Sequence, residues 1–193
     1  MLSADEYLDD FWPRFERIED YFWKLERRQH FREPGNPSWE AAVAGDWDRA
    51  LALIGQTRQS AAEHYRRIAD LGFEGRRVRV VELPPSPYVQ WSMRALKVRV
   101  EAGERTRVVL ASEIADRERD RPLPEIVILG RATMYEVLYD DTGTLTGARR
   151  VDDHRMIAAC RAELADLYAH SEEFMCFFDR QIRPLSPLAC LPG

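Results

Sequence analysis

The chain has 193 residues and a formal net charge of −5, with 45% hydrophobic and 32% charged residues. These values are typical of one soluble globular domain, or of one domain with a helical extension. No apolar run approaches the roughly 18–20 residues that span a bilayer, and the acidic N-terminus is unlike a signal peptide, so we expect no membrane partner.

Residues 1–72 are predicted to form a helical region. Ser3 and Glu6 have the spacing of a capping box, and apolar side chains recur every three or four residues from Tyr7 to Leu25. This pattern predicts a helix over residues 3–33, interrupted near Pro13. Two shorter helical stretches follow Ser38, and another helix covers residues 56–71. The aromatic side chains of the first helix are expected to be core, with a partner-binding helix as the alternative.

Residues 73–178 are predicted to form the sheet domain. Residues 78–81 and 107–110 are rich in valine and flank a helix over 88–102, an order that predicts two parallel strands. A strand over 125–129 and a hairpin around residues 140–143 follow, and a last helix runs to about residue 174. The predicted fold is therefore α+β: a helical N-terminal region, then a mixed sheet of about five strands with two packing helices. Residues 179–193 are expected to be an irregular tail.

The sequence shows no pattern for a metal or a cofactor. Three cysteines, an odd number without a CxxC pair, favour free thiols and a cytoplasmic location. No histidine lies three or four residues from a cysteine, the spacing that would place both on one helix face. Asp140, Asp141, Asp152 and Asp153 have the chemistry of a cation site, but turn and cap positions explain them more simply. We therefore expect no metal site and no cofactor.

Positive charge is concentrated between residues 76 and 109, where eight Lys or Arg residues face three Glu. Guanidinium groups bind phosphate and carboxylate in bidentate fashion, and a helix N-terminus also favours anions. The predicted ligand-binding residues at this strand-to-helix turn are Arg77, Arg79, Ser86, Tyr88, Trp91 and Arg107. The alternative is purely structural: solvated arginines that pair with nearby glutamates, a serine cap and two core aromatics.

Three blocks carry a family resemblance: the aromatic segment Phe11 to Glu26, RVRVVELPPSPYVQW from Arg77 to Trp91, and EAGERTRVV from Glu101 to Val109. With the hairpin and the last helix, they resemble an actinobacterial family of unknown function that is commonly encoded beside helix-turn-helix regulators. The order of elements also resembles half of a phospholipase-D-like sensor domain. The catalytic HxK signature of active phospholipase-D-like enzymes is missing, so the resemblance implies binding or regulation and transfers no catalytic residue.

The leading functional hypothesis is a non-enzymatic regulatory or ligand-binding protein with an anion-favouring pocket. Its partner would be a transcriptional regulator, another protein or an anionic small molecule. The alternative is an enzyme or biosynthetic accessory acting on a phosphorylated or carboxylated small molecule. A deep pocket with convergent polar groups favours a small molecule, and a flat aromatic face favours a protein. Nucleic acid is expected to be an unlikely partner, because the chain is acidic and carries no DNA-binding motif.

Overall fold

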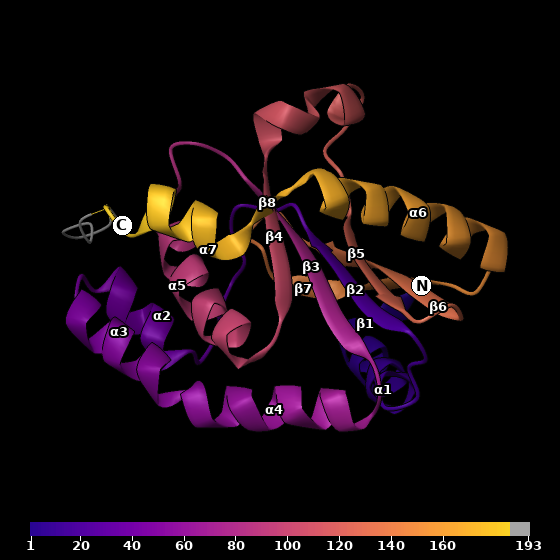
Figure 1. Ribbon diagram of the computed structural model, residues 1–193, viewed down its shortest axis with the longest axis horizontal. Coiled ribbons are helices and arrows are strands. Elements are labelled where there is room, and N and C mark those ends of the chain that lie inside the picture. Colours follow the sequence, from indigo (N-terminus) through magenta and orange to yellow (C-terminus); the bar gives the residue numbers. More distant parts are fainter. Residues whose placement is uncertain (186–193) are drawn as a thin grey trace.

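The computed structural model describes residues 1–185 and is an α+β structure around a mixed sheet of eight strands (Figure 1). The strands are β1 (Leu2–Ser3), β2 (Tyr21–Glu26), β3 (Glu74–Val81), β4 (Arg105–Leu110), β5 (Glu125–Leu129), β6 (Thr133–Tyr139), β7 (Leu145–Val151) and β8 (Glu172–Glu173). The helices are α1 (Ala4–Phe15), α2 (Pro37–Val43), α3 (Trp47–Gln56), α4 (Arg58–Asp70), α5 (Pro87–Ala102), α6 (His154–His170) and α7 (Phe174–Phe177). A 3₁₀ helix, Ala111–Glu118, follows β4, and a π-helical turn, Phe178–Ile182, follows α7.

The α+β prediction is confirmed, but the sheet has eight strands rather than about five. Its order is β1-β7-β6-β5-β2-β3-β4-β8, with β2, β3 and β4 parallel to one another and the other pairings antiparallel. The predicted parallel pair around a helix is therefore confirmed as β3 and β4 on either side of α5. The predicted hairpin is confirmed as β6 and β7.

The largest correction concerns residues 16–33, which are not helical. Helix α1 ends at Phe15, Asp20 adopts a φ of 85°, and the chain then enters β2, a central strand of the sheet. Aspartate tolerates this left-handed conformation better than most residues. The segment expected to be all helical thus supplies a strand that the sheet depends on, because β2 joins the parallel strands to the antiparallel ones.

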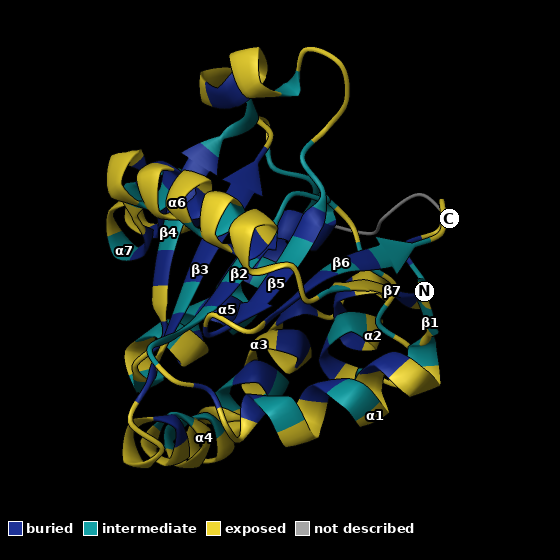
Figure 2. Cartoon of the chain, turned by 90° about the vertical axis from the view of Figure 1, so that its right-hand side faces the viewer, coloured by how far each residue is buried: buried dark blue, intermediate teal, exposed yellow. Residues whose placement is uncertain are grey.

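Helix α6 covers one face of the sheet, and this face is apolar (Figure 2). Side chains of β2, β3, β5 and β6 meet an apolar stripe of α6 in one cluster that includes Trp23, Val78, Ile128, Ile157 and Leu164. The predicted cap of α6 is confirmed, since the side chain of Asp153 accepts hydrogen bonds from the two backbone N–H groups of Arg155 and Met156.

The opposite face is covered by separate helices at its two ends. Helix α1 packs over β5, β6 and β7 through a cluster that contains Phe11, Phe15 and Tyr135. Helices α5 and α7 pack over β3 and β4 through Val81, Val108 and Phe174 among others. Between these two clusters, β2 and β3 present charged side chains instead of apolar ones, and helices α2, α3 and α4 arch over them (Figure 1).

The end of the described chain is more ordered than expected. Residues 178–182 form the π-helical turn, and Phe178 and Ile182 are buried against α5 in the same cluster as Phe174. The predicted irregular tail is thus partly structured up to residue 185, and its remainder, residues 186–193, lies outside the described residues.

Candidate functional site: a charged cavity under the helical layer

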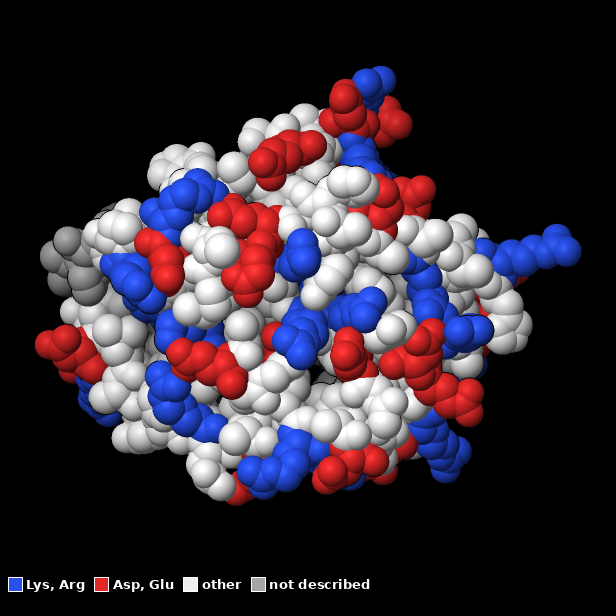
Figure 3. Space-filling model, viewed as in Figure 1, with Lys and Arg blue, Asp and Glu red and all other residues white. Residues whose placement is uncertain are grey.

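A cavity of about 790 Å³ lies between the charged part of the sheet and helices α2 to α5. The hollow opens on the face seen in Figure 3, just above α4, with basic and acidic side chains at its rim. Five basic residues and two glutamates line the cavity: Lys24, Glu26, Arg32, Glu33, Arg77, Arg79 and Arg99. The cavity is therefore locally basic in a chain whose formal net charge is −5.

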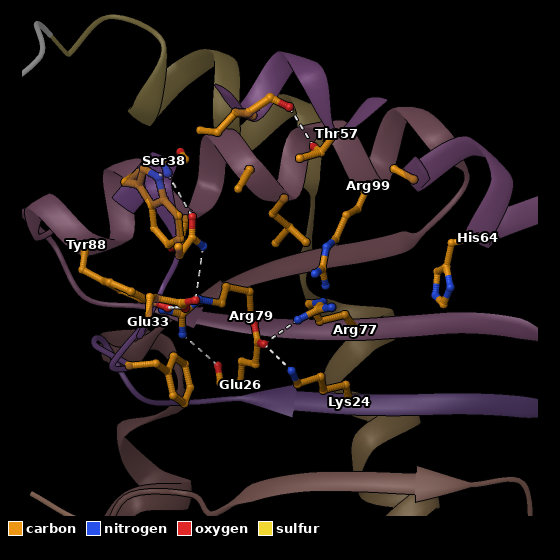
Figure 4. A pocket seen from close by; sticks show the side chains of 18 of the residues that line it. Lys24, Glu26, Glu33, Ser38, Thr57, His64, Arg77, Arg79, Tyr88 and Arg99 are labelled. Atoms are coloured by element: carbon orange, nitrogen blue, oxygen red, sulfur yellow. Dashed lines mark hydrogen bonds and ion pairs between the residues drawn. The ribbon is translucent and has the colours of Figure 1, made fainter. Parts of the chain in front are cut away.

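The floor of the cavity is a buried ionic network that crosses three strands and ends on Glu104, just before β4. Glu26 accepts a hydrogen bond from Arg77 Nη1 at 2.5 Å and forms an ion pair with Lys24 Nζ at 2.7 Å. Arg77 Nε also donates a hydrogen bond to Glu104. Lys24 pairs directly with Arg77, and Glu26 with Arg79, across the parallel strands β2 and β3, so the contact between Glu26 and Arg77 is a diagonal one (Figure 4). Strand pleating then turns all four of these side chains to one face.

The network stabilises its own charges. Burial alone would raise the pKa of Glu26, but Arg77 and Lys24 hold it well below its ordinary value. Burial would likewise raise the pKa of Glu104, and Arg77 again lowers it. For Arg77, burial works against ionisation, yet the two carboxylates raise its pKa well above the usual value. All three groups are therefore charged at neutral pH and neutralise one another, so Arg77 has little capacity left for a ligand.

Arg79 differs from Arg77 because it has no carboxylate partner among the described residues. Its Nη1 donates to the backbone carbonyls of Glu26 and Val80 at 3.1 and 3.0 Å. Its Nη2 is buried without a hydrogen-bond partner, and the residue is only 2% exposed. Burial lowers the pKa of Arg79 from its ordinary value, although Glu26 partly offsets this. A buried cation without a salt bridge is costly, and an anion in the adjoining cavity would reduce that cost.

One end of the cavity is aromatic. Tyr88 and Trp91 project from the first turns of α5, with ring centroids 5.5 Å apart, and Trp39 of α2 packs against both. Their polar atoms are held in place: Tyr88 Oη donates to Glu33 Oε1 at 2.7 Å, and Trp91 Nε1 donates to Ser38 Oγ at 2.8 Å. Burial and the nearby Glu33 raise the pKa of Tyr88, so it stays a neutral donor. This end thus offers rigid ring faces.

The other end lies under α4. Arg99, from α5, extends toward Arg77 across the cavity, and His64 of α4 points in from above (Figure 4). The guanidinium of Arg99 has no ion pair or hydrogen bond with any residue in 1–185, whereas Tyr65 of α4 donates its hydroxyl hydrogen to Glu104. Burial, together with the charge of Arg99, lowers the pKa of His64, so its imidazole is neutral at pH 7.

The six predicted ligand-binding residues do not all lie at the cavity. Arg77, Arg79, Tyr88 and Trp91 line the cavity, so the structure brings these four together. Ser86 and Arg107 do not line it. Ser86 is the N-cap of α5, where its hydroxyl accepts from Val89 N and donates to Gln29 O.

Arg107 lies on the opposite face of the sheet. It pairs in register with Val78, whose side chain belongs to the cluster under α6, while Arg77 pairs with Thr106 on the cavity face. Its guanidinium donates to Ser171 O at 2.9 Å and lies over the Tyr168 ring. The alternation of side chains along the strands therefore separates Arg107 from Arg77 and Arg79, although all three belong to the basic segment between residues 76 and 109.

Sequence reasoning missed three groups of the cavity: the pair Lys24 and Glu26, the carboxylate Glu33, and Arg99. The predicted helix over residues 3–33 includes Lys24 and Glu26 and therefore gives them no partners on neighbouring strands. Arg99 was part of the basic cluster but was not selected. The available signal was the period-two pattern of residues 21–26, with Tyr21, Trp23 and Leu25 on one face and Phe22, Lys24 and Glu26 on the other.

The structure also places Asp140 and the cysteines. Asp140 organises the β6–β7 turn by accepting from the backbone N–H groups of Thr142 and Thr144, as a turn residue should. Within residues 1–185 there is no group of three or more potential ligands that could hold a metal ion. Cys160 and Cys176 are free thiols, and Cys190 lies outside the described residues. No helix in this part of the chain is long and apolar enough to cross a membrane.

The chain belongs to a family described as a domain of unknown function, DUF6879, which matches residues 9–179. No curated protein matches the chain. Among solved structures, it is similar to TrmBL2, an archaeal chromatin protein for which a novel mode of DNA binding is described. The TM-score is 0.48 and the sequence identity 10%, over 90% of this chain and 51% of TrmBL2, so this chain spans about half the length of that protein.

This comparison corrects one expectation. Nucleic acid was expected to be an unlikely partner, and similarity to a DNA-binding chromatin protein contradicts that expectation, which we therefore drop. The similarity is too weak to assign DNA binding to this chain.

Proposed function

We propose that this protein is a non-enzymatic receptor for a small organic anion, a carboxylate or a phosphate, which binds in the cavity between the sheet and helices α2 to α5. A protein that binds a small molecule without consuming it acts as a sensor, so the regulatory role and the phospholipase-D-like sensor relation implied by the sequence resemblance belong to this proposal. So does the cytoplasmic location expected from the cysteines.

The observation that supports the proposal is the buried guanidinium of Arg79, which has no salt bridge and whose Nη2 has no hydrogen-bond partner. Its guanidinium lines the cavity, is almost fully buried and has no carboxylate partner within the described chain. Arg99 adds a second unpaired guanidinium from the opposite side of the cavity. Guanidinium groups bind carboxylate and phosphate through two parallel hydrogen bonds, which makes these anions the best-matched ligands.

The shape of the cavity favours a small molecule over a protein partner. Its volume of about 790 Å³ lies within the roughly 300–1,000 Å³ of typical ligand pockets, and polar groups converge in it from β2, β3, α4 and α5. Its aromatic end adds ring faces against which the body of an organic anion would pack.

Binding rather than catalysis is favoured by the state of the carboxylates. A general base works best when its pKa lies near the operating pH. Glu26 and Glu104 are instead held by Arg77, with pKa values below the ordinary range. Glu33 is already occupied as the acceptor of the Tyr88 hydroxyl. These groups are therefore built to position charge rather than to move protons.

Titration calorimetry with benzoate and with phenyl phosphate tests the proposal. We expect saturable binding of at least one of the two anions by the wild-type protein. Arg79→Met and Arg99→Met each weaken it about ten-fold or more, because a charge-assisted hydrogen bond is lost. Arg66→Met is the matched control, since Arg66 is exposed on α4 and does not line the cavity.

Two results would overturn the proposal. One is the absence of saturable binding of both anions at millimolar concentration. The other is unchanged affinity in folded Arg79→Met and Arg99→Met variants. Arg99 is exposed, so its substitution leaves the core intact and keeps the test valid even if the buried Arg79 variant unfolds.

A further inference from the structure

A second, smaller cavity of about 210 Å³ adjoins the first one beneath α1 and α4. Its end is formed by Phe11 and Phe15 of α1, Phe22 of β2 and Ile68 of α4, all of which belong to the apolar cluster under α1. More of the surface of this lobe is apolar than polar, although charged residues, among them Arg76 and Glu104, also line it. Apolar material that enters it leaves water for an apolar environment, which is favourable.

The two cavities adjoin each other. Six residues line both of them: Trp12, Lys24, His64, Tyr65, Arg77 and Arg99. These residues form a neck to which Arg99 contributes an unpaired guanidinium, with the small lobe on one side and the large cavity with Arg79 on the other. A molecule that spans the neck would therefore meet cations at its anionic end and phenylalanine rings at its other end.

From this arrangement we infer the class of ligand: an amphipathic organic anion whose carboxylate or phosphate lies among Arg79 and Arg99 and whose apolar arm enters the small lobe. The inference rests on the proposed function and adds the requirement for the arm. The size of the lobe sets the size of the arm. Apolar cavities of about 150 Å³ hold a benzene molecule, so a lobe of about 210 Å³ holds one substituted ring or a short alkyl chain.

Gly75 provides a way to close the small lobe without touching the arginines. It lies in β3 beside Phe22, on the face that carries Arg77, and it lines the small lobe but not the large cavity. A Cβ at this position would meet Tyr65 and Phe22 at ordinary contact distances of 3.8 and 3.9 Å. A valine there is compatible with a strand and would fill part of the lobe with its two methyl groups.

The test compares two carboxylates, benzoate and 4-phenylbutanoate, by titration calorimetry on the full chain. The longer acid has three additional methylene groups, with which its ring reaches beyond the neck. We expect wild-type protein to bind 4-phenylbutanoate about ten-fold more tightly than benzoate, since buried methylene groups favour binding. Gly75→Val should reduce this preference to less than three-fold while leaving benzoate affinity unchanged.

Each outcome has a distinct meaning. If benzoate binds but the longer acid gains nothing, or if folded Gly75→Val keeps the full preference, the inference about the apolar arm is wrong while the anion receptor stands. If neither acid binds, the inference fails, and the proposed function fails with it only if phenyl phosphate does not bind either. Should Gly75→Val not fold, Gly75→Ala, whose methyl group makes only ordinary contacts, replaces it and should reduce the preference by about half.

Discussion

Removal of the Arg77 guanidinium is the sharpest test of how the floor of the cavity is held together. Arg77 is 7% exposed at its side chain and is the cation that joins Glu26 and Glu104, whose side chains are 13% and 4% exposed. Arg77→Met preserves most of the volume but leaves two buried carboxylates without this partner. Removing one partner from a buried ion pair costs about 3–5 kcal/mol of unfolding free energy. We therefore expect a loss of about 3–5 kcal/mol at pH 7.

The pH dependence of this loss separates charge from packing. Because Glu26 and Glu104 have folded-state pKa values below their unfolded ones, their stabilisation is present above about pH 4.3 and is lost as the pH falls through the folded-state values. Wild-type stability should thus decline in acid. In Arg77→Met both carboxylates bind protons more readily, so the difference between the two proteins should shrink as the pH is lowered from 7 toward 4.

Urea unfolding followed by circular dichroism, at several pH values, measures both effects. The exposed Arg105→Met, outside the cavity, serves as the matched control and should change stability by less than about 0.5 kcal/mol. Adding Glu104→Gln to Arg77→Met should recover part of the loss, since it removes one unpaired charge. The reasoning is refuted if Arg77→Met lies within about 1 kcal/mol of wild type at pH 7, or if its deficit does not depend on pH.

Two further substitutions test the edge of the sheet and the aromatic end of the cavity. Gly147→Ala should destabilise the protein by about 1–3 kcal/mol in thermal unfolding, because φ is 149° and a Cβ would lie 2.0 Å from Leu2 O across the β1–β7 pairing. Gly55→Ala, with no atom within 4 Å of its Cβ, should instead be neutral or slightly stabilising, and equal losses at both sites would contradict the argument. Trp91→Phe should cost roughly 2 kcal/mol through lost packing and a lost hydrogen bond to Ser38, and a double-mutant cycle with Ser38→Ala should show coupling of about 1 kcal/mol. Additive effects in that cycle would mean that the hydrogen bond does not contribute.

Local signals in the sequence determined several elements correctly. The capping box of α1, with Ser3 and Glu6, and the Asp153 cap of α6 are present as predicted, because a cap depends only on residues within one helical turn. The β6–β7 turn likewise follows from the chemistry of residues 140–143. The crossover from β3 through α5 to β4 followed from the two valine-rich segments that flank the predicted helix over residues 88–102.

Two sequence patterns compete over strand β2. Phe22 and Leu25 continue the three-to-four-residue spacing of α1, while the alternation within β2 places apolar Trp23 and Leu25 under α6 and charged Lys24 and Glu26 over the cavity. The alternation covers only six residues, and it does not reveal that the charged face is covered by helices instead of solvent. The pairing of β2 with β3 and β5 decides its structure, and both of these strands are distant from it in the sequence.

Composition and local pattern alone determined that this chain folds into an α+β domain and that its positive charge gathers between residues 76 and 109. Only the tertiary structure decided which arginines share a site. Strand pleating turned Arg77 and Arg79 toward the cavity and Arg107 away from it. A diagonal contact between β2 and β3 neutralised Arg77 with Glu26 and left Arg79 without a hydrogen bond to a carboxylate. Such selection depends on pairings between segments some fifty residues apart, which long-range packing sets and local propensity does not encode.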